Sequence, residues 1–93
     1  MRERQIEQKL KNDVLAKGGL AMKFVSPGTV GVPDRIVLIP GGKVYFVELK
    51  APGQKPSPKQ VRIAKLLAAL GHEVRLIDSM AKVKEFVDEI YSP

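Results

Sequence analysis

Apolar residues recur along the first part of the chain with the period of an α-helix. Ile6, Leu10 and Val14 are spaced by four residues and form one stripe on a helical wheel. Gly18-Gly19 follows this stripe as a helix stop. The pattern therefore predicts an amphipathic helix over residues 2–17.

The next three apolar runs have the length and composition of β-strands. They cover Leu20–Val25, Asp34–Ile39 and Lys43–Lys50, and the turn residues Pro40-Gly41-Gly42 separate the last two. Both strands of this hairpin have apolar residues at odd and at even positions. We therefore expect a sheet that is covered on both faces.

The remainder of the chain predicts a helix, a strand and a final helix. Ser57-Pro58-Lys59-Gln60 has the form of a capping box with proline at the first helical position, and the helix that begins there ends at Leu70-Gly71. A strand over Glu73–Ile77 and a helix over Ser79–Tyr91 follow. The side chains of the second helix that we expect to be buried are Val61, Ala64, Leu67 and Ala68 or their neighbours.

The element order is therefore αβββαβα, in a single domain over residues 1–93. Hairpin strands are antiparallel, and the last strand returns after a helix. The predicted fold class is thus α/β with a mixed four-stranded sheet flanked by helices. A chain of 93 residues is long enough for one hydrophobic core.

Charge and composition restrict the kinds of partner and site. Sixteen Lys and Arg residues against ten Asp and Glu residues give a net charge of +6, which favours a polyanionic partner such as nucleic acid. The chain has no Cys and one histidine, His72, so any metal must bind oxygen ligands. Apolar runs are shorter than a membrane span, so we expect a cytoplasmic protein without a membrane partner.

The hairpin brings two acidic residues together if its turn has three residues. In that register Ile39 lies opposite Lys43. Asp34 then lies opposite Glu48, and Lys50 projects from the same face of the sheet. Facing carboxylates repel unless a cation lies between them, and Mg²⁺ or Mn²⁺ prefers such oxygen ligands. A two-residue turn would instead place the two acids on opposite faces, and a surface ion pair with Lys50 is the alternative interpretation.

Two further acidic residues lie near the apolar stripe of the first helix. Glu3 and Glu7 project from the same side of this helix, although a helix normally directs its acids outward. An ion pair between Glu7 and Lys11 on a solvated flank is the interpretation that the helix pattern favours.

Three short segments resemble the active-site motifs of a nuclease superfamily. Val32-Pro33-Asp34-Arg35, Glu48-Leu49-Lys50 and Ser57-Pro58-Lys59-Gln60 are similar to the motifs of the PD-(D/E)xK nucleases. Within that superfamily the chain resembles the virus-type replication-repair nuclease (VRR-NUC) family nearly from end to end. The resemblance implies a restriction-endonuclease-like fold. Outside the three motifs, the resemblance to this family includes Ser26, Gly28, Gly31 and Gly71.

The resemblance implies a role for each motif residue. Asp34 and Glu48, with the carbonyl of Leu49, would bind the metal. Lys50 would position or activate a water molecule. Gln60 would lie beside Lys50, although its place in the capping box explains a glutamine there without catalysis.

The first helix would complete the site with one acid. Both Glu3 and Glu7 fit the spacing that the family implies, so the choice between them stays open. Arg35 points away from Asp34 in the predicted register, which suits a role in the fold or at a phosphate.

The implied activity is metal-dependent hydrolysis of DNA, with Mg²⁺ or Mn²⁺ and without an organic cofactor. Branched, flapped or four-way-junction DNA of phage-type replication, recombination or repair is the implied substrate, and a phage or prophage origin is expected. Symmetric cutting of a junction would need a homodimer. A non-catalytic basic module that binds nucleic acid is the alternative. The expected DNA contacts are Ser26, Gly28, Arg35, Lys55, Ser57 and Lys59.

Overall fold

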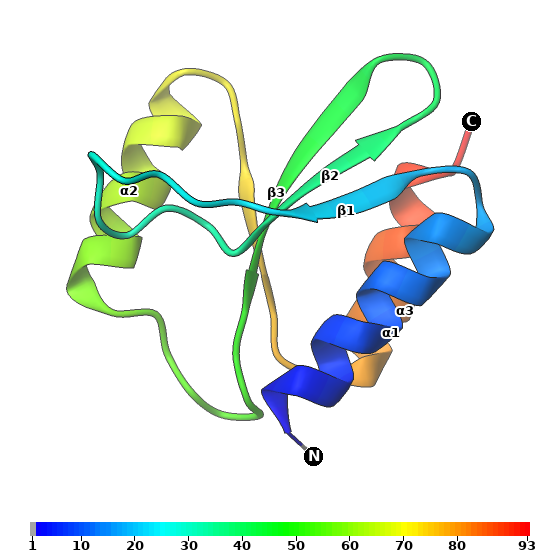
Figure 1. Cartoon of the computed structure of the whole chain (residues 1–93), viewed down its shortest axis with the longest axis horizontal. Helices are drawn as coiled ribbons and strands as arrows, with labels where there is room; N and C mark the ends of the chain where they lie inside the picture. Colours follow the sequence, from blue (N-terminus) through cyan, green and yellow to red (C-terminus); the bar gives the residue numbers. More distant parts are fainter. Residues whose placement is uncertain (1) are drawn as a thin grey trace.

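A four-stranded mixed sheet with three helices forms the fold of the computed structural model, which describes residues 2–93 (Figure 1). The order αβββαβα is confirmed, and each element begins and ends within two residues of its predicted limits. No helix in this described part is long and apolar enough to cross a membrane. The elements are α1 (Glu3–Ala16), β1 (Leu20–Lys23), β2 (Arg35–Ile39), β3 (Lys43–Leu49), α2 (Pro58–Ala69), β4 (Val74–Ile77) and α3 (Met80–Ile90).

The strands lie in the order β1-β2-β3-β4, and only the β3–β4 pair is parallel. Ile39 pairs with Lys43, which confirms the three-residue turn. Gly41 and Gly42 both have positive φ angles within this turn, a conformation that glycine adopts without strain. Continued by one step beyond β2, the same register places Asp34 opposite Glu48.

One face of the sheet carries the hydrophobic core. Helices α1 and α3 lie side by side on this face (Figure 1), and the predicted stripe of α1 is fully buried against it. Val37 and Val47 point into the same core from β2 and β3. The α3 residues that complete it are Val83, Phe86, Val87 and Ile90.

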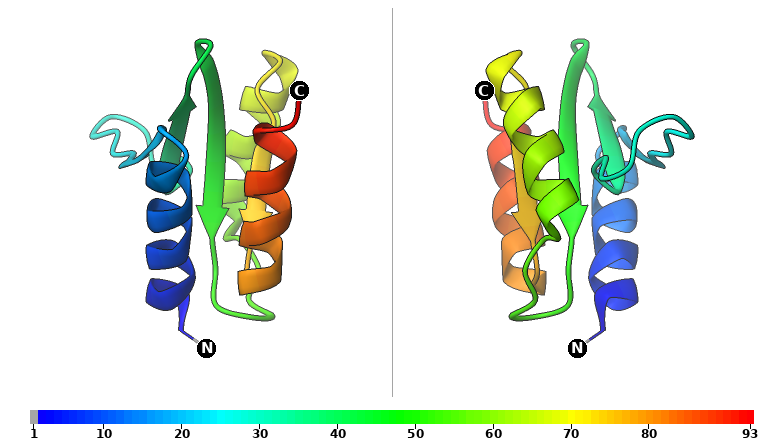
Figure 2. Two further views of the ribbon diagram at one scale, coloured as in Figure 1. Left: turned by 90° about the vertical axis from the view of Figure 1, so that its right-hand side faces the viewer. Right: turned by 90° about the vertical axis from the view of Figure 1, so that its left-hand side faces the viewer.

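The other face is only partly covered, so the prediction of a sheet covered on both faces is wrong for part of the sheet. Helix α2 contacts β4 (Figure 2, right). Ile63 is its only buried residue, and the predicted core residues Val61 and Ala68 are exposed. The helical spacing of the apolar residues predicted a buried stripe on this helix. Because α2 lies at the edge of the sheet, the sheet covers only part of that stripe. The apolar stripe of α2 therefore lines an open groove of about 310 Å³ opposite Val74 and Leu76.

Beyond α2, three neighbouring strands expose apolar side chains on this same face. Leu20 pairs with Leu38, and Leu38 pairs with Val44, so these side chains form a row across β1, β2 and β3. Met22 follows Leu20 on the same face. Leu20 and Met22 are each 51% exposed and Val44 is 45% exposed. We refer to Leu20, Met22, Leu38 and Val44 as the open sheet face.

The loop between β1 and β2 packs directly on the start of α2. Gly31 has a φ of 97°, and a Cβ atom built there would lie 2.5 Å from the carbonyl oxygen of Lys59. No side chain fits at that distance, so the loop and the helix backbone are in close contact at this position. Gly28 in the same loop has open space around it.

Replacing Gly31 should therefore destabilise the protein far more than replacing Gly28. We expect Gly31→Ala to lower the free energy of unfolding by about 2–4 kcal/mol, because the new methyl group meets backbone atoms and the φ angle is unfavourable. Gly28→Ala should change it by less than about 0.5 kcal/mol. Urea denaturation of the two variants tests this, and equal effects would show that the loop does not rest on α2 as described.

Candidate active site

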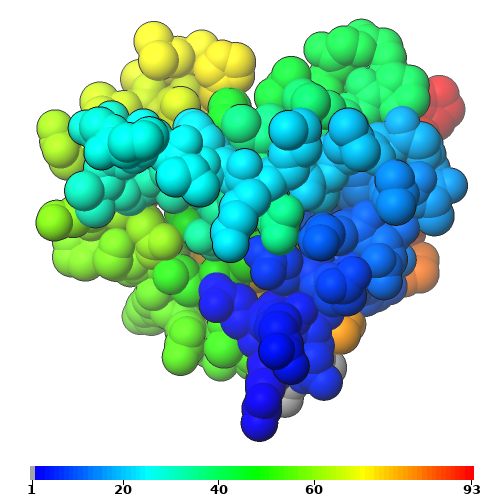
Figure 3. Space-filling model, in the orientation of Figure 1, coloured from blue at the N-terminus to red at the C-terminus, as the bar shows by residue number. Residues whose placement is uncertain are grey.

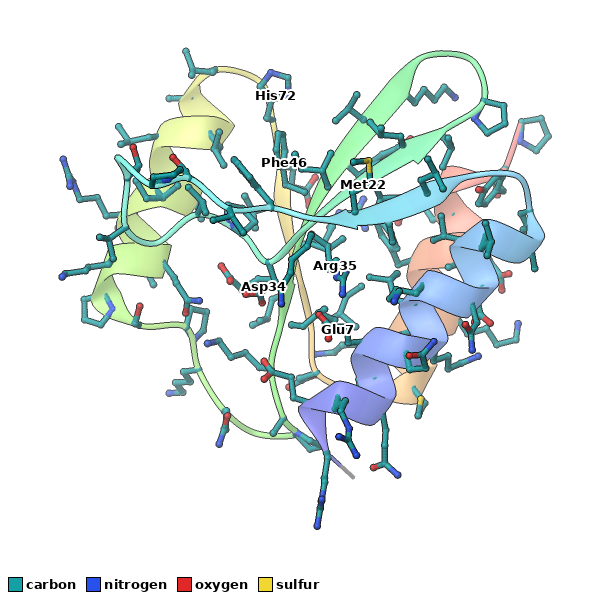
Figure 4. All side chains as sticks on the ribbon, viewed as in Figure 1. Glu7, Met22, Asp34, Arg35, Phe46 and His72 are labelled. Carbon is teal, nitrogen blue, oxygen red and sulfur yellow. The ribbon has the colours of Figure 1, made fainter. Side chains whose placement is uncertain are left out.

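Asp34 and Glu48 meet where β2 begins and β3 ends. Glu48 is almost completely buried, at 2% exposure, and Asp34 is half-buried. The backbone N–H of Leu49 donates a 2.7 Å hydrogen bond to Oδ2 of Asp34. Figure 4 shows Asp34 near the middle of the molecule, between α1 and α2. The predicted pair of acids is therefore brought together, and the backbone of Leu49 lies beside it.

The environment of Glu48 disfavours a negative charge on its carboxyl group. Burial is the main cause that raises its pKa from 4.5 to about 7, and the charge of Asp34 and a hydrogen bond with it act in the same direction. The positive charge of Lys50 opposes these effects. A carboxyl group held in this way is ready to accept a cation in place of its proton.

Gln60 caps the start of α2 as the sequence predicts, and it also contacts Glu48, whereas the resemblance implied a place beside Lys50. Its Oε1 accepts a hydrogen bond from the backbone N–H of Ser57, and the backbone N–H of Gln60 donates to the Ser57 hydroxyl. The predicted capping box is therefore confirmed. Nε2 of Gln60 also donates a 2.8 Å hydrogen bond to Oε1 of Glu48. One side chain thus fixes the start of α2 and orients the buried carboxylate.

Lys50 follows the last residue of β3. Its backbone N–H donates to the carbonyl oxygen of Ile77, which holds the end of β3 against β4. Because its charge lowers the pKa of Glu48, its ammonium group lies within electrostatic reach of that carboxylate.

Arg35 projects from the opposite face of the sheet, as the register predicts. It is 8% exposed, and its Nε donates a 3.1 Å hydrogen bond to Oε2 of Glu7 while Nη1 donates to the carbonyl oxygen of Ala21. Figure 4 shows Glu7 reaching from α1 toward Arg35. The predicted Glu7–Lys11 pair is therefore wrong, because the helix turns Glu7 toward the sheet. The geometry of Arg35 favours its role in the fold over a contact with DNA.

Glu3, in contrast, is exposed in the first turn of α1. Its charge is one of the smaller influences that raise the pKa of Glu48. Of the two acids of α1, Glu7 is bound to Arg35 and Glu3 is free of any ion pair within the described residues.

The positive charge of the chain is concentrated around α2. Residues 49–72 contain five basic residues and no acidic one, so this segment carries +5 of the net charge of +6. The expected DNA contacts Lys55 and Lys59 are exposed, and so are Arg62 and Lys65, two further basic residues of α2 that the sequence-based list did not include. The absence of acidic residues from residues 49–72 could have drawn attention to them. In Figure 3, the lime-green atoms of α2 lie at the left of the molecule, and the blue atoms of α1 lie at its right and at its lower end.

Three other expected DNA contacts, Ser26, Gly28 and Ser57, belong to the start of α2 or to the loop that packs on it. Gly28 is exposed and Ser26 is half-buried in the loop that packs on this helix. Ser57 is exposed, but its hydroxyl and its backbone N–H are both engaged with Gln60.

The donor set fits a hard divalent cation. No group of three or more acidic, histidine or cysteine residues in residues 2–93 gathers closely enough to hold a metal. Two carboxylates and nearby backbone carbonyls remain, and Mg²⁺ in proteins is held in this way, by one or two carboxylates with water and substrate oxygens. Asp34 and Glu48 supply those carboxylates.

Comparison with known proteins gives two close similarities. No family model matches the sequence. A protein of Acyrthosiphon pisum secondary endosymbiont phage 1, named "Putative nuclease p44", is 56% identical over 79 residues, which are 85% of each chain. A solved structure described as "VRR_NUC domain" has a TM-score of 0.88 and 31% identity, and the likeness covers 96% of this chain and 97% of that one. The similarity extends over nearly the whole fold.

The burial of Glu48 predicts a stability that depends on pH. The pKa of Glu48 is higher in the folded protein than in the unfolded chain. The contribution of this carboxyl group to the free energy of unfolding is therefore fully present below pH 4.5 and is lost as the pH rises through about 7. Without divalent metal, Glu48→Gln should be more stable than the native protein by about 1–3 kcal/mol at pH 8, and the difference should vanish near pH 4.5.

Chemical denaturation across this pH range measures the difference. The same substitution at the exposed Glu85 of α3 serves as the control, and it should show no such pH-dependent gain. A Glu48→Gln variant that is less stable than the native protein at pH 8 would contradict the account of a desolvated carboxylate.

Proposed function

Since this chain belongs to the VRR-NUC family, we propose that it is a metal-dependent nuclease that hydrolyses phosphodiester bonds in DNA. The observation that carries the proposal is the buried Glu48 carboxylate, held beside Asp34 with Lys50 within electrostatic reach. Burying two carboxylates together is unfavourable in a protein that uses them only for its fold. A cation between them removes the repulsion and gives the pair a function.

The residues of the site divide into metal ligands and positioning groups. Asp34, Glu48 and the carbonyl oxygen of Leu49 would hold Mg²⁺ or Mn²⁺. The bound ion would supply a lowered pKa for water and charge stabilisation at the phosphate. Gln60 orients Glu48 through its Nε2 hydrogen bond, and the capping box fixes Gln60 in turn. Glu3 is the α1 acid that we assign to this site, because its charge acts on Glu48.

Lys50 has a separate role because it offers only hydrogen-bond donors. Its ammonium group would hold the attacking water in line with the leaving oxygen and would stabilise the negative charge that develops on the phosphate. It does not bind the metal itself.

The charge of the α2 segment supports DNA as the substrate. Lys55 precedes this helix, and Lys59, Arg62 and Lys65 lie on it; Gln60 of the same helix contacts Glu48. Exposed basic residues without acidic neighbours attract the phosphate backbone regardless of base sequence. Binding to the phosphate backbone without regard to base sequence fits an enzyme that recognises the shape of branched DNA, such as flaps or four-way junctions. The phage relative supports a phage or prophage origin. For such an enzyme we propose a role in replication, recombination or repair.

The open sheet face supports a homodimer as the working form. Its four side chains are apolar and uncharged, and three of them, Leu20, Met22 and Val44, are about half exposed. Such a patch is typical of a contact with another protein surface. Each chain carries +6, which opposes association elsewhere, whereas this face carries no charge. Two copies related by a two-fold axis would present two sites, which is what symmetric cutting of a junction requires.

Cleavage assays with the native protein, Lys50→Ala and Lys43→Ala test the activity. Lys43 is the exposed lysine at the other end of β3 and serves as the matched control. Duplex plasmid, forked DNA and four-way-junction DNA are incubated with Mg²⁺, Mn²⁺ or EDTA under single-turnover conditions.

We expect the native protein and Lys43→Ala to cut branched DNA in Mg²⁺ or Mn²⁺ and not in EDTA. Lys50→Ala should lose about a hundredfold or more of the cleavage rate while it still binds DNA and metal. DNA binding without metal-dependent cleavage would identify a non-catalytic module. A Lys50→Ala variant that cuts at the native rate would remove the lysine from the mechanism.

Substitution of Met22 tests the dimer. In sedimentation equilibrium the native protein should have twice the 10.2 kDa mass of the chain. Met22→Glu should be monomeric, because burying a carboxylate in the contact is unfavourable. Leu70→Glu is the control, since Leu70 is an apolar residue at the end of α2 that is 74% exposed. A native monomer, or a dimer that Met22→Glu leaves intact, would contradict this interface.

A further inference from the structure

One ion pair connects three elements behind the site. Arg35 opens β2 and lies next to Asp34 in the chain, on the other face of the sheet. Its Nε binds Glu7 of α1, and its Nη1 binds the carbonyl oxygen of Ala21 in β1. The two contacts bridge residues that are 28 and 14 positions apart in the chain. Arg35 thus ties α1 and β1 to the strand that carries Asp34.

The same ion pair determines where the first turn of α1 lies. Residues four apart project from the same side of a helix, so the direction of Glu7 also sets the direction of Glu3. Ile6, Leu10 and Val14 fix the middle of α1 in the core, but residues 2–5 are all exposed. The Glu7–Arg35 contact is therefore the polar contact with the sheet that lies nearest to Glu3.

The position of Asp34 depends on the same region. Its carbonyl oxygen accepts a hydrogen bond from the N–H of Phe24, which extends the pairing of β1 with β2 past the last paired residue of β1. The Arg35 contact with Ala21 holds the same two strands together from the opposite face. Arg35 therefore holds β1 against the start of β2, directly after Asp34.

We propose that the Glu7–Arg35 ion pair is a positioning device for the active site, which holds Glu3 and Asp34 in place relative to Glu48. Neither Glu7 nor Arg35 touches DNA or metal in this arrangement. Both act through the carboxylates on the other side. The proposal rests on the nuclease function proposed above, and it assigns to Glu7 a different role from that of Glu3.

The rate of single-turnover cleavage in saturating Mg²⁺ tests the device. Glu7→Gln should lower the rate about tenfold, because displacement of a catalytic group by a fraction of an ångström to 1 Å is known to cost up to about a hundredfold. Asp13→Asn is the matched control. It removes the other ion pair of α1, the 2.7 Å contact between Lys9 and Asp13, whose carboxylate is about as exposed as that of Glu7. This control should cut within about twofold of the native rate.

A double variant separates positioning from a general loss of structure. Because part of the effect of Glu7 passes through Glu3, Glu7→Gln should cause a smaller loss of rate in a Glu3→Gln background than in the native protein. Arg35→Lys, which keeps the charge, should retain more activity than Arg35→Met. Cleavage by Glu7→Gln at the native rate, or rate losses that multiply in the double variant, would overturn the proposal.

Hydrogen exchange tests the device without any reference to cleavage. The backbone amides of residues 5–8 should exchange faster in Glu7→Gln than in the native protein, and Asp13→Asn should leave them unchanged. Native exchange rates in Glu7→Gln would overturn the proposal even if the protein cuts DNA. Faster exchange in a protein that does not cut DNA would instead show that the Glu7–Arg35 ion pair holds the first turn of α1, and it would reject the nuclease function.

Discussion

The burial of a carboxylate beside a second carboxylate is the constraint on which the rest of this structure depends. Glu48 lies inside the fold, at 2% exposure, and water has little access to compensate its charge. Its pKa of about 7 measures that conflict. A protein selected for stability alone would place an apolar residue there. The surrounding elements hold the carboxylate in place despite this cost, which is typical of a functional site.

The support comes from three directions. The hairpin register brings Asp34 opposite Glu48, and the two glycines of the turn set that register. Gln60 contacts Glu48 from α2, and the close approach of Gly31 to Lys59 holds that helix against the loop before β2. Helix α1 approaches from the third direction. Each element thus fixes one group around the same buried carboxylate.

Local patterns in the sequence were enough for the elements and for the position of the hairpin turn. The Pro-Gly-Gly segment left a two-residue and a three-residue turn open, and the pairing of Ile39 with Lys43 shows that the turn has three residues. The capping box at Ser57 and Gln60 depends on neighbouring residues and was predictable. The family resemblance was carried by the same short motifs, and the likeness to the VRR_NUC structure confirmed it.

Contacts between distant segments were not predictable in this way. The helix pattern of α1 predicted an ion pair of Glu7 with Lys11. In the fold, Glu7 instead pairs with Arg35, which is buried and 28 residues away in the chain. The apolar stripe of α2 was visible, but the sequence does not say that the sheet ends beside it. For the same reason, the apolar residues of the hairpin suggested burial on both faces, and part of one face is open.

A crystal of the native protein grown with Mn²⁺ tests the central claim most directly, because manganese is located by its own anomalous scattering. The account predicts an anomalous peak at the carboxylates of Asp34 and Glu48, within bonding distance of an oxygen atom of each. It also predicts that the hydrogen bond of Gln60 to Glu48 is kept. A map without a peak at this position, with the two carboxyl groups still in direct contact, would contradict the account.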